Sequence, residues 1–87
     1  MLIQEKYESM RIEKNDSGVT VVTLNRPERL NAVNGVMHRE LSTFSRDADV
    51  DRDTRVVVLA GEGRAFCAGG DFGGDSTGDA PTAEEAR

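Results

Sequence analysis

The chain has 87 residues, of which 37% are apolar and 31% charged, and its formal net charge is −5. This composition is typical of one small globular unit, and its acidity argues against nucleic acid, whose phosphates attract clustered Lys and Arg. No apolar run approaches the roughly 20 residues that span a bilayer, and the single cysteine, Cys67, excludes an internal disulfide.

The first residues carry early acidic side chains and no apolar segment, which is not the pattern of a signal peptide. A lone cysteine fits a reducing compartment. We therefore expect a cytoplasmic protein without a membrane partner.

Residues 5–24 are predicted to form a β-hairpin. Apolar side chains alternate weakly over residues 7–13, and residues 15–18 (Asn-Asp-Ser-Gly) form a strong turn cluster. Residues 19–24 (VTVVTL) are rich in β-branched side chains, which favour a strand.

Residues 34–60 are predicted to form a helix followed by a buried strand. Apolar residues recur at helical spacing, and Asn34 can cap the helix that carries them: Met37, Leu41, Phe44 and Ala48. Four aspartates then suggest an exposed, solvated connection: Asp47, Asp49, Asp51 and Asp53.

The apolar run over residues 55–60 (RVVVLA) indicates a strand buried on both faces, as in a parallel sheet. Strand, helix and strand together form a βαβ unit, which should cross over right-handed. We expect the chain by itself to leave part of this run exposed, because such a strand needs cover on both sides.

Residues 61–81 form a glycine-rich loop that allows several interpretations. A dinucleotide fingerprint is weakened by Phe66, which stands where a small residue is required. A P-loop is excluded, because no glycine precedes a lysine. The adjacent Gly69 and Gly70 could instead direct backbone N–H groups at a developing negative charge, although spacing alone favours a tight turn without a ligand.

Residues 82–87 begin with a capping box, in which Thr82 caps a helix and Glu85 reaches back. Arg87 follows barely one turn later, and one turn is not a stable helix by itself. We therefore expect this chain to be a fragment of a longer enzyme.

Two segments then resemble a known family. Residues 25–34 (NRPERLNAVN) resemble the N-R-P-x-x-x-N-A-[LV] segment of the enoyl-CoA hydratase/isomerase, or crotonase, family. Residues 55–71 (RVVVLAGEGRAFCAGGD) resemble its most distinctive stretch. The order, the spacing and the intervening helix also match, so that the resemblance covers roughly residues 5–87 and outweighs the tight-turn interpretation.

The resemblance implies an α/β fold of the crotonase-like (ClpP/crotonase) type, built from ββα units in a spiral and here truncated. It implies an acyl-CoA thioester as ligand, with coenzyme A as part of the substrate and no metal or other cofactor. Hydration of a 2-enoyl-CoA, as in fatty acid β-oxidation, is the first expected reaction, and double-bond isomerisation the next. Family members commonly assemble as homotrimers or hexamers.

The resemblance also implies roles for single residues. The N–H of Gly70 would be the first donor of the oxyanion hole, and Arg29 would lie near the CoA phosphates. Asp71 is grouped with the CoA site, where its carboxylate is expected to tie down loop amides. The implied CoA-binding set is Arg29, Ala32, Ala68, Gly69, Gly70 and Asp71.

In the family, the second oxyanion donor and the catalytic glutamates come from later units. Glu84 and Glu85 do not stand at matching positions, so the chain alone is expected to be inactive. Two other functions stay open: a non-catalytic CoA-binding or interaction module, and a nucleotide-binding βαβ fragment. His38 is interpreted as a surface histidine, Cys67 as a packing residue, and Arg64 as a solvated charge or a phosphate partner.

Overall fold

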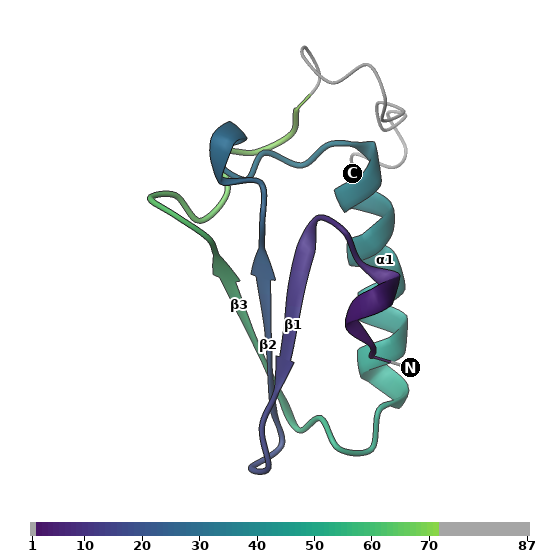
Figure 1. Ribbon diagram of the computed structural model, residues 1–87. Coiled ribbons are helices and arrows are strands. Elements are labelled where there is room, and N and C mark those ends of the chain that lie inside the picture. Colours follow the sequence, from purple (N-terminus) through teal and green to yellow (C-terminus); the bar gives the residue numbers. More distant parts are fainter. Residues whose placement is uncertain (1, 72–87) are drawn as a thin grey trace.

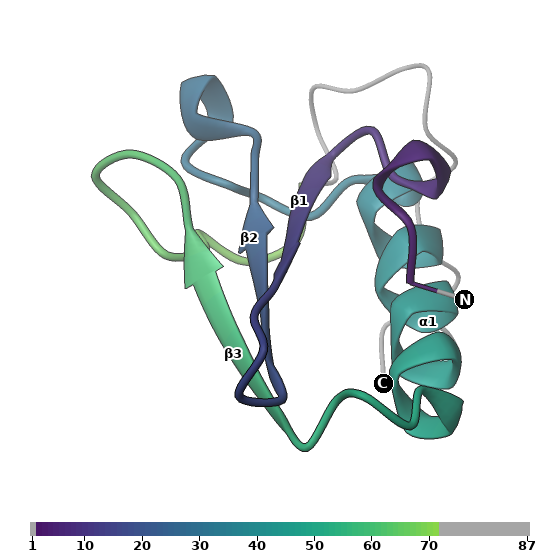
Figure 2. The same cartoon turned by 60° about the horizontal axis from the view of Figure 1, so that its bottom comes forward.

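The computed structural model describes residues 2–71, which form a three-stranded sheet with one long helix beside it (Figure 1). The sheet order is β1-β2-β3, in which β1 runs antiparallel and β3 parallel to the central β2. Figure 2 shows α1 alongside the sheet from a second direction. The elements in chain order are η1 (Gln4–Lys6), β1 (Met10–Lys14), β2 (Val19–Leu24), η2 (Pro27–Arg29), α1 (Gly35–Val50) and β3 (Val56–Gly61).

The predicted hairpin is present as β1 and β2, which pair from Met10 opposite Leu24 to Lys14 opposite Thr20. Asn15 shapes the turn, because its Oδ1 accepts from the backbone N–H groups of Ser17 at 2.9 Å and Val19 at 3.0 Å. The first strand begins at Met10 and not at residue 7, since the preceding residues include the 3₁₀ turn η1.

The predicted helix is confirmed as α1. Asn34 caps it, because its Oδ1 accepts from the Met37 N–H at 2.9 Å. Met37 and Phe44 are buried against strand residues, and Leu41 and Ala48 pack at the edge of the same cluster. The helical periodicity therefore identified the buried side of α1.

The prediction of a solvated acidic connection is wrong for Asp47 and Asp51. Asp47 lies within α1 and accepts from Lys6 Nζ at 2.6 Å. Asp51 accepts from Lys14 Nζ at 2.8 Å and from the Thr54 hydroxyl. These hydrogen bonds lower the pKa of both carboxyl groups below their ordinary value. The two aspartates thus tie α1 and its exit to the hairpin and to the first residues of the chain.

The prediction that residues 55–60 form a strand buried on both faces is also wrong for this chain. β3 forms as a strand parallel to β2, but its side chains from Val56 to Leu59 are 42–54% exposed. The reason is the position of α1, whose buried residues pack against β1 and β2 and leave β3 at the sheet edge. The exposure agrees with the expectation that part of this run is left exposed.

The predicted helix start at Thr82, and the part of the glycine-rich loop beyond Asp71, lie outside the described residues. Within residues 2–71, no helix is long and apolar enough to cross a membrane.

Tyr7 supplies a test of the core. It is buried, its ring meets Phe44 edge to face at 6.3 Å, and its hydroxyl donates to Asp47 at 3.4 Å. Burial, followed by the negative charge of Asp47, raises the pKa of Tyr7 from 10.0 to about 12. Since the folded state keeps the phenol neutral, its contribution to stability is fully present below pH 10 and is lost as the pH rises towards 12.

We predict that ultraviolet titration of the phenolate gives a midpoint near 12 for the folded chain and near 10 in urea. Tyr7 is the only tyrosine and there is no tryptophan, so the signal reports one group. The Tyr7→Phe variant should lose less unfolding free energy over this pH interval than the wild type. A folded-state midpoint at 10 would contradict the described packing.

Candidate functional site

The glycine-bearing segment, residues 66–71, runs beside the segment that leads from β2 to α1. The Ala68 N–H donates to the Leu30 carbonyl at 3.0 Å. Val33 then makes both of its backbone hydrogen bonds to the segment, donating to the Gly69 carbonyl and accepting from the Asp71 N–H, each at 2.8 Å. These contacts form a parallel bridge between Val33 and Gly70.

The bridge decides the direction of the Gly70 amide. In extended backbone, successive residues present their N–H and C=O groups to opposite sides. Because Gly69 C=O and Asp71 N–H face Val33, the Gly70 N–H faces away from it. Gly70 is exposed, and within the described part of the chain its N–H therefore has no protein acceptor.

Gly69 allows the chain to reach this geometry. Its φ is +105°, a conformation that side-chain-bearing residues rarely adopt. Its N–H points to Cys67 Sγ at 3.5 Å, so the two neighbouring glycine amides have different surroundings. The glycine pair thus provides one turn and one outward donor.

Asn31 is the structural centre of the site, although no local sequence pattern predicts its role. Its side chain is fully buried, and its Oδ1 accepts from the Arg26 N–H at 2.7 Å. Its Nδ2 donates to the carbonyls of Glu62 at 2.9 Å and Ala65 at 2.8 Å. One amide side chain therefore joins the segment after β2 to the loop after β3.

The backbone at this point has an unusual conformation. Leu30 and Asn31 have φ values of +54° and +58°, in the left-handed region that costs non-glycine residues about 1–3 kcal/mol. Asn tolerates this conformation better than most residues. Gly61, the last residue of β3, is required for another reason: a Cβ there would lie 2.4 Å from the Phe66 carbonyl oxygen.

Asp71 is held by two arginines. Its side chain is 7% exposed, and its carboxylate accepts from Arg26 Nη2 at 3.3 Å and from Arg29 Nη2 at 3.2 Å. Arg26 Nη1 also donates to the Ala32 carbonyl. The expected partners of Asp71, loop amides, are thus replaced by guanidinium groups. The carboxylate therefore anchors the glycine segment to both arginines.

The structure brings the predicted CoA-binding residues together along this bridge. Arg29 is exposed, with its guanidinium next to Asp71, and Ala68, Gly69 and Gly70 are exposed beside it. Ala32 is half-buried one residue before the bridge. All six predicted residues therefore lie in or beside two adjacent segments, 29–33 and 68–71.

The remaining candidates have other roles. Cys67 is half-buried and packs against the core, in agreement with its prediction as a packing residue. Arg64 is exposed and His38 half-exposed. No group of His, Cys, Asp and Glu within residues 2–71 could hold a metal ion.

The nucleotide-binding interpretation loses support from the path of the loop. A dinucleotide fingerprint requires a helix directly after its glycines, so that the helix N-terminus meets the pyrophosphate. Here residues 62–71 instead lead to the bridge with Val33.

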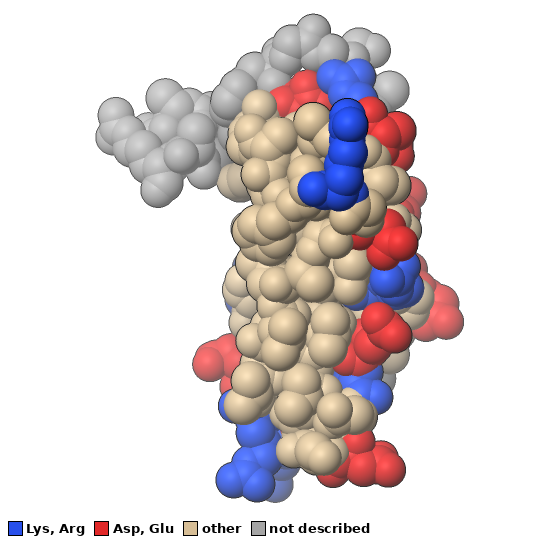
Figure 3. Space-filling view, turned by 90° about the vertical axis from the view of Figure 1, so that its left-hand side faces the viewer, with Lys and Arg blue, Asp and Glu red and all other residues tan. Residues whose placement is uncertain are grey.

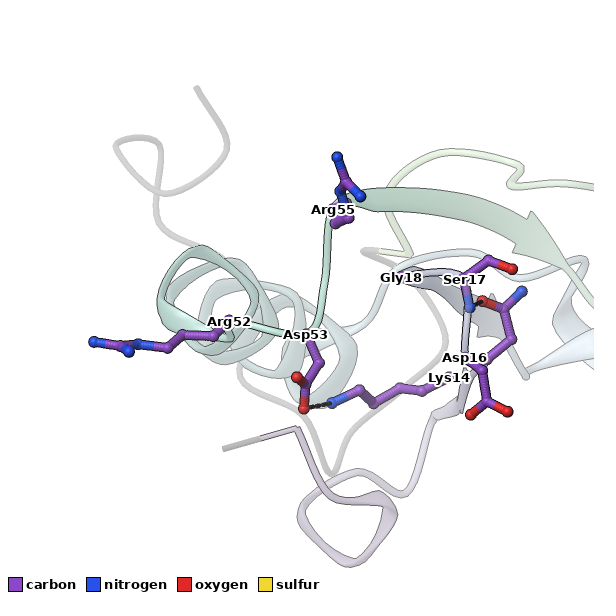
Figure 4. Close-up of a pocket in the computed structure, with 8 residues that line it drawn as sticks. Lys14, Asp16, Ser17, Gly18, Arg52, Asp53 and Arg55 are labelled. Atoms are coloured by element: carbon purple, nitrogen blue, oxygen red, sulfur yellow. Dashed lines mark hydrogen bonds and ion pairs between the residues drawn. The ribbon is translucent and has the colours of Figure 1, made fainter.

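A polar hollow lies at the other end of the sheet, at the tip of the hairpin (Figure 4). Arg52 and Arg55 point in different directions, and Lys14 turns to Asp53, at 3.9 Å. Its charged groups do not converge on one point, so the hollow does not form a binding site. It is lined by Lys14, Asn15, Asp16, Ser17, Gly18, Arg52, Asp53 and Arg55.

Comparisons with known proteins agree on one family. The sequence model described as enoyl-CoA hydratase/isomerase matches residues 19–77. The chain is 45% identical over 69 residues to 1,2-epoxyphenylacetyl-CoA isomerase of Escherichia coli, covering 76% of this chain and 26% of that protein. It is 45% identical over 66 residues to a probable enoyl-CoA hydratase of Rhizobium meliloti, covering 76% and 25%.

Solved structures give the same result. Enoyl-CoA hydratase EchA8_6 of Mycobacterium marinum superposes with a TM-score of 0.71 at 39% identity, covering 74% of this chain and 30% of that one. A probable enoyl-CoA hydratase/isomerase of Mycobacterium abscessus gives 0.71 at 42% identity, covering 75% and 25%. The chain thus spans about a quarter of the length of the curated relatives it matches.

The Asn31 network can be tested without changing the backbone requirement. Asn31→Gly keeps the left-handed conformation but leaves two part-buried carbonyls and one N–H without their partner. We expect the variant to lose about 2–4 kcal/mol of unfolding free energy in urea denaturation. Leu30→Gly, at the neighbouring left-handed position, is the matched control: it relieves the same backbone cost without removing these hydrogen bonds, so it should lose less unfolding free energy than Asn31→Gly. Equal effects would show that the side-chain network contributes little.

Proposed function

Because this chain belongs to the enoyl-CoA hydratase/isomerase family, we propose that it forms the acyl-CoA-binding, amino-terminal part of an enzyme that hydrates 2-enoyl-CoA thioesters. The observation that carries the proposal is the exposed Gly70 N–H, held outward by the bridge to Val33. This amide donates to the thioester oxygen.

The chemistry explains why a fixed amide is useful. When water attacks the β-carbon of an enoyl thioester, negative charge accumulates on the thioester oxygen. A donor that is already oriented stabilises this charge more than the neutral substrate, and one such donor contributes roughly 2.7–4 kcal/mol. Gly70 meets the requirement because neighbouring residues, and not the ligand, set the direction of its N–H.

The CoA portion lies along the same two segments. The pantetheine and adenine pack against three small residues: Ala32, Ala68 and Gly69. Arg29 contacts a CoA phosphate while Asp71 keeps its guanidinium near the glycine segment. This charge contact is exposed, so it is sensitive to salt. CoA enters as part of the substrate.

The complete reaction needs groups from elsewhere in the fold. The second oxyanion donor and the acid and base of the family come from later units, so the chain alone binds ligand without turning it over. The complete enzyme is cytoplasmic and assembles as a homotrimer or hexamer. A non-catalytic CoA-binding module would use the same contacts, and only turnover in the presence of the remaining fold distinguishes it.

The Gly70 N–H can be removed without changing any side chain. Cys67 permits chemical ligation of residues 1–66 to a synthetic peptide of residues 67–87 in which the Gly70 amide is replaced by an ester. The ligand is a 3-ketoacyl-CoA, whose enolate places charge on the thioester oxygen. We expect it to bind the ester-containing chain at least about tenfold more weakly than the unmodified chain. Titration calorimetry measures the change.

The matched control is the same replacement at Gly69, whose N–H points to Cys67 Sγ. It should leave the affinity nearly unchanged. Equal affinity of the Gly70 ester and the unmodified chain would exclude Gly70 as the donor, and absence of binding to the unmodified chain would reject the CoA site.

Arg29 is tested through the phosphate. Arg29→Ala should weaken CoA binding severalfold at low salt, and the difference should shrink as salt rises, because screening weakens exposed charge contacts. Arg46→Ala, on the exposed surface of α1, is the charge-matched control. An Arg29 variant that binds CoA as the wild type does would remove this residue from the site.

A further inference from the structure

The ion pair between Arg26 and Asp71 joins two largely buried side chains. Most charged residues within residues 2–71 are exposed, like those at the margins of the broad face in Figure 3. The side chains of Arg26 and Asp71 are only 12% and 7% exposed. Taking two charges out of water costs free energy that their attraction must offset, so a buried pair is weak evidence for stability alone. This pair is therefore a candidate for fixing a local geometry.

Two arginines hold Asp71, and they differ in freedom. Arg29 has a side chain that is 43% exposed, and its Nη2 lies 3.2 Å from the Asp71 carboxylate. Arg26 approaches the same carboxylate with Nη2 at 3.3 Å, while its Nη1 donates to the Ala32 carbonyl. A planar guanidinium held at two separate acceptors keeps one orientation. An exposed ion pair such as that of Arg29 is weak and is screened by salt.

The backbone of Arg26 is fixed as well. Its N–H donates to Asn31 Oδ1 at 2.7 Å. Its carbonyl accepts from the N–H groups of Asn31 at 2.8 Å and Arg29 at 2.9 Å. The guanidinium thus extends from an immobilised turn to Asp71, the residue that follows Gly70.

We infer that Arg26 is a positioning residue for the Gly70 donor, and that the two arginines have separate tasks. Arg29 divides its donors between Asp71 and a ligand phosphate, so its hold on Asp71 weakens when CoA binds. Arg26 keeps the carboxylate paired at that moment and prevents the glycine-bearing segment from turning. The inference deepens the proposed function and rests on it.

The need for a second arginine follows from the burial of Asp71. If Arg29 were its only partner, a phosphate that drew Arg29 away would leave a buried carboxylate unpaired, which is strongly destabilising. The Asp71 N–H, which donates to the Val33 carbonyl at 2.8 Å, would then lose its support from the side chain. Gly70 lies between the two residues that Val33 holds, so a loosened Asp71 also loosens the direction of the Gly70 N–H.

A positioning role differs from a purely structural one in what it does to ligand preference. We define the enolate preference as the affinity for a 3-ketoacyl-CoA divided by the affinity for a saturated acyl-CoA of the same length. An oriented donor at the thioester oxygen raises this ratio, because it binds the charged oxygen more strongly than the neutral one. Effects on the CoA portion cancel, since both ligands carry it.

Titration calorimetry of the 87-residue chain measures this ratio. We expect Arg26→Gln to lower the enolate preference at least about fivefold. Arg26→Lys should lower it less, because one ammonium keeps the charge but cannot hold two separate acceptors in a plane. Arg29→Gln should weaken both ligands by the same factor and leave the ratio as it is. Arg46→Gln, on the exposed surface of α1, is the matched control and should change neither affinity.

Amide hydrogen exchange in the free chain gives a second measurement that needs no ligand. In both Arg26 variants the amides of Val33 and Asp71 should exchange at least about tenfold faster than in the wild type, while those of α1 and β2 keep their rates. If Arg26→Gln exchanges rapidly throughout and is therefore unfolded, Arg26→Lys carries the test.

Two results would overturn the inference: an enolate preference that survives both Arg26 substitutions, or one that falls as much in Arg29→Gln as in Arg26→Gln. A wild-type chain that binds both ligands equally would reject the proposed function instead. Exchange then decides the role of Arg26 alone: unchanged rates at Val33 and Asp71 would refute it, and local acceleration would support it. The two proposals can thus fail separately.

Discussion

The two backbone hydrogen bonds that Val33 makes to Gly69 and Asp71 control the rest of the site. They fix the glycine-bearing segment in extended form next to the segment before α1, and the alternation of extended backbone then turns the Gly70 N–H outward. A side-chain donor would be less rigidly oriented, because a peptide amide held at both neighbours has almost no freedom to rotate. The proposed donor is thus a consequence of strand-like pairing outside the main sheet.

Two polar groups keep this pairing in place. The buried side chain of Asn31 joins the segment before α1 to the loop after β3 through three hydrogen bonds, and Asp71 holds the glycine segment to two arginines. Both lie where the chain has irregular backbone, whose carbonyl groups would otherwise lack a partner within the described residues. The regular sheet and α1 provide the frame, and these side chains determine the position of the loops on it.

Much of this frame follows from local sequence. The turn at Asn15, the cap at Asn34 and the buried side of α1 depend on contacts within a few residues, so composition and periodicity predict them. Asn31 and the partners of Asp71 depend on residues more than 30 positions away, which no local pattern reveals. β3 is a third case. Its apolar sequence, which lies within the family match, is typical of a strand covered on both faces, whereas its side chains are exposed in this chain. The role of Gly70 stays a proposal, which rests on the family resemblance and on the outward direction of its N–H.

The direction of the Gly70 amide is tested most directly by hydrogen exchange of single amides in the free chain, followed by nuclear magnetic resonance. The account predicts rapid exchange at Gly70, near the rate of an unstructured glycine, between slowly exchanging amides at Ala68 and Asp71, whose N–H groups are bonded to Leu30 and Val33. Slow exchange at Gly70 without ligand would mean that its N–H is already bonded within the protein, and would contradict the account.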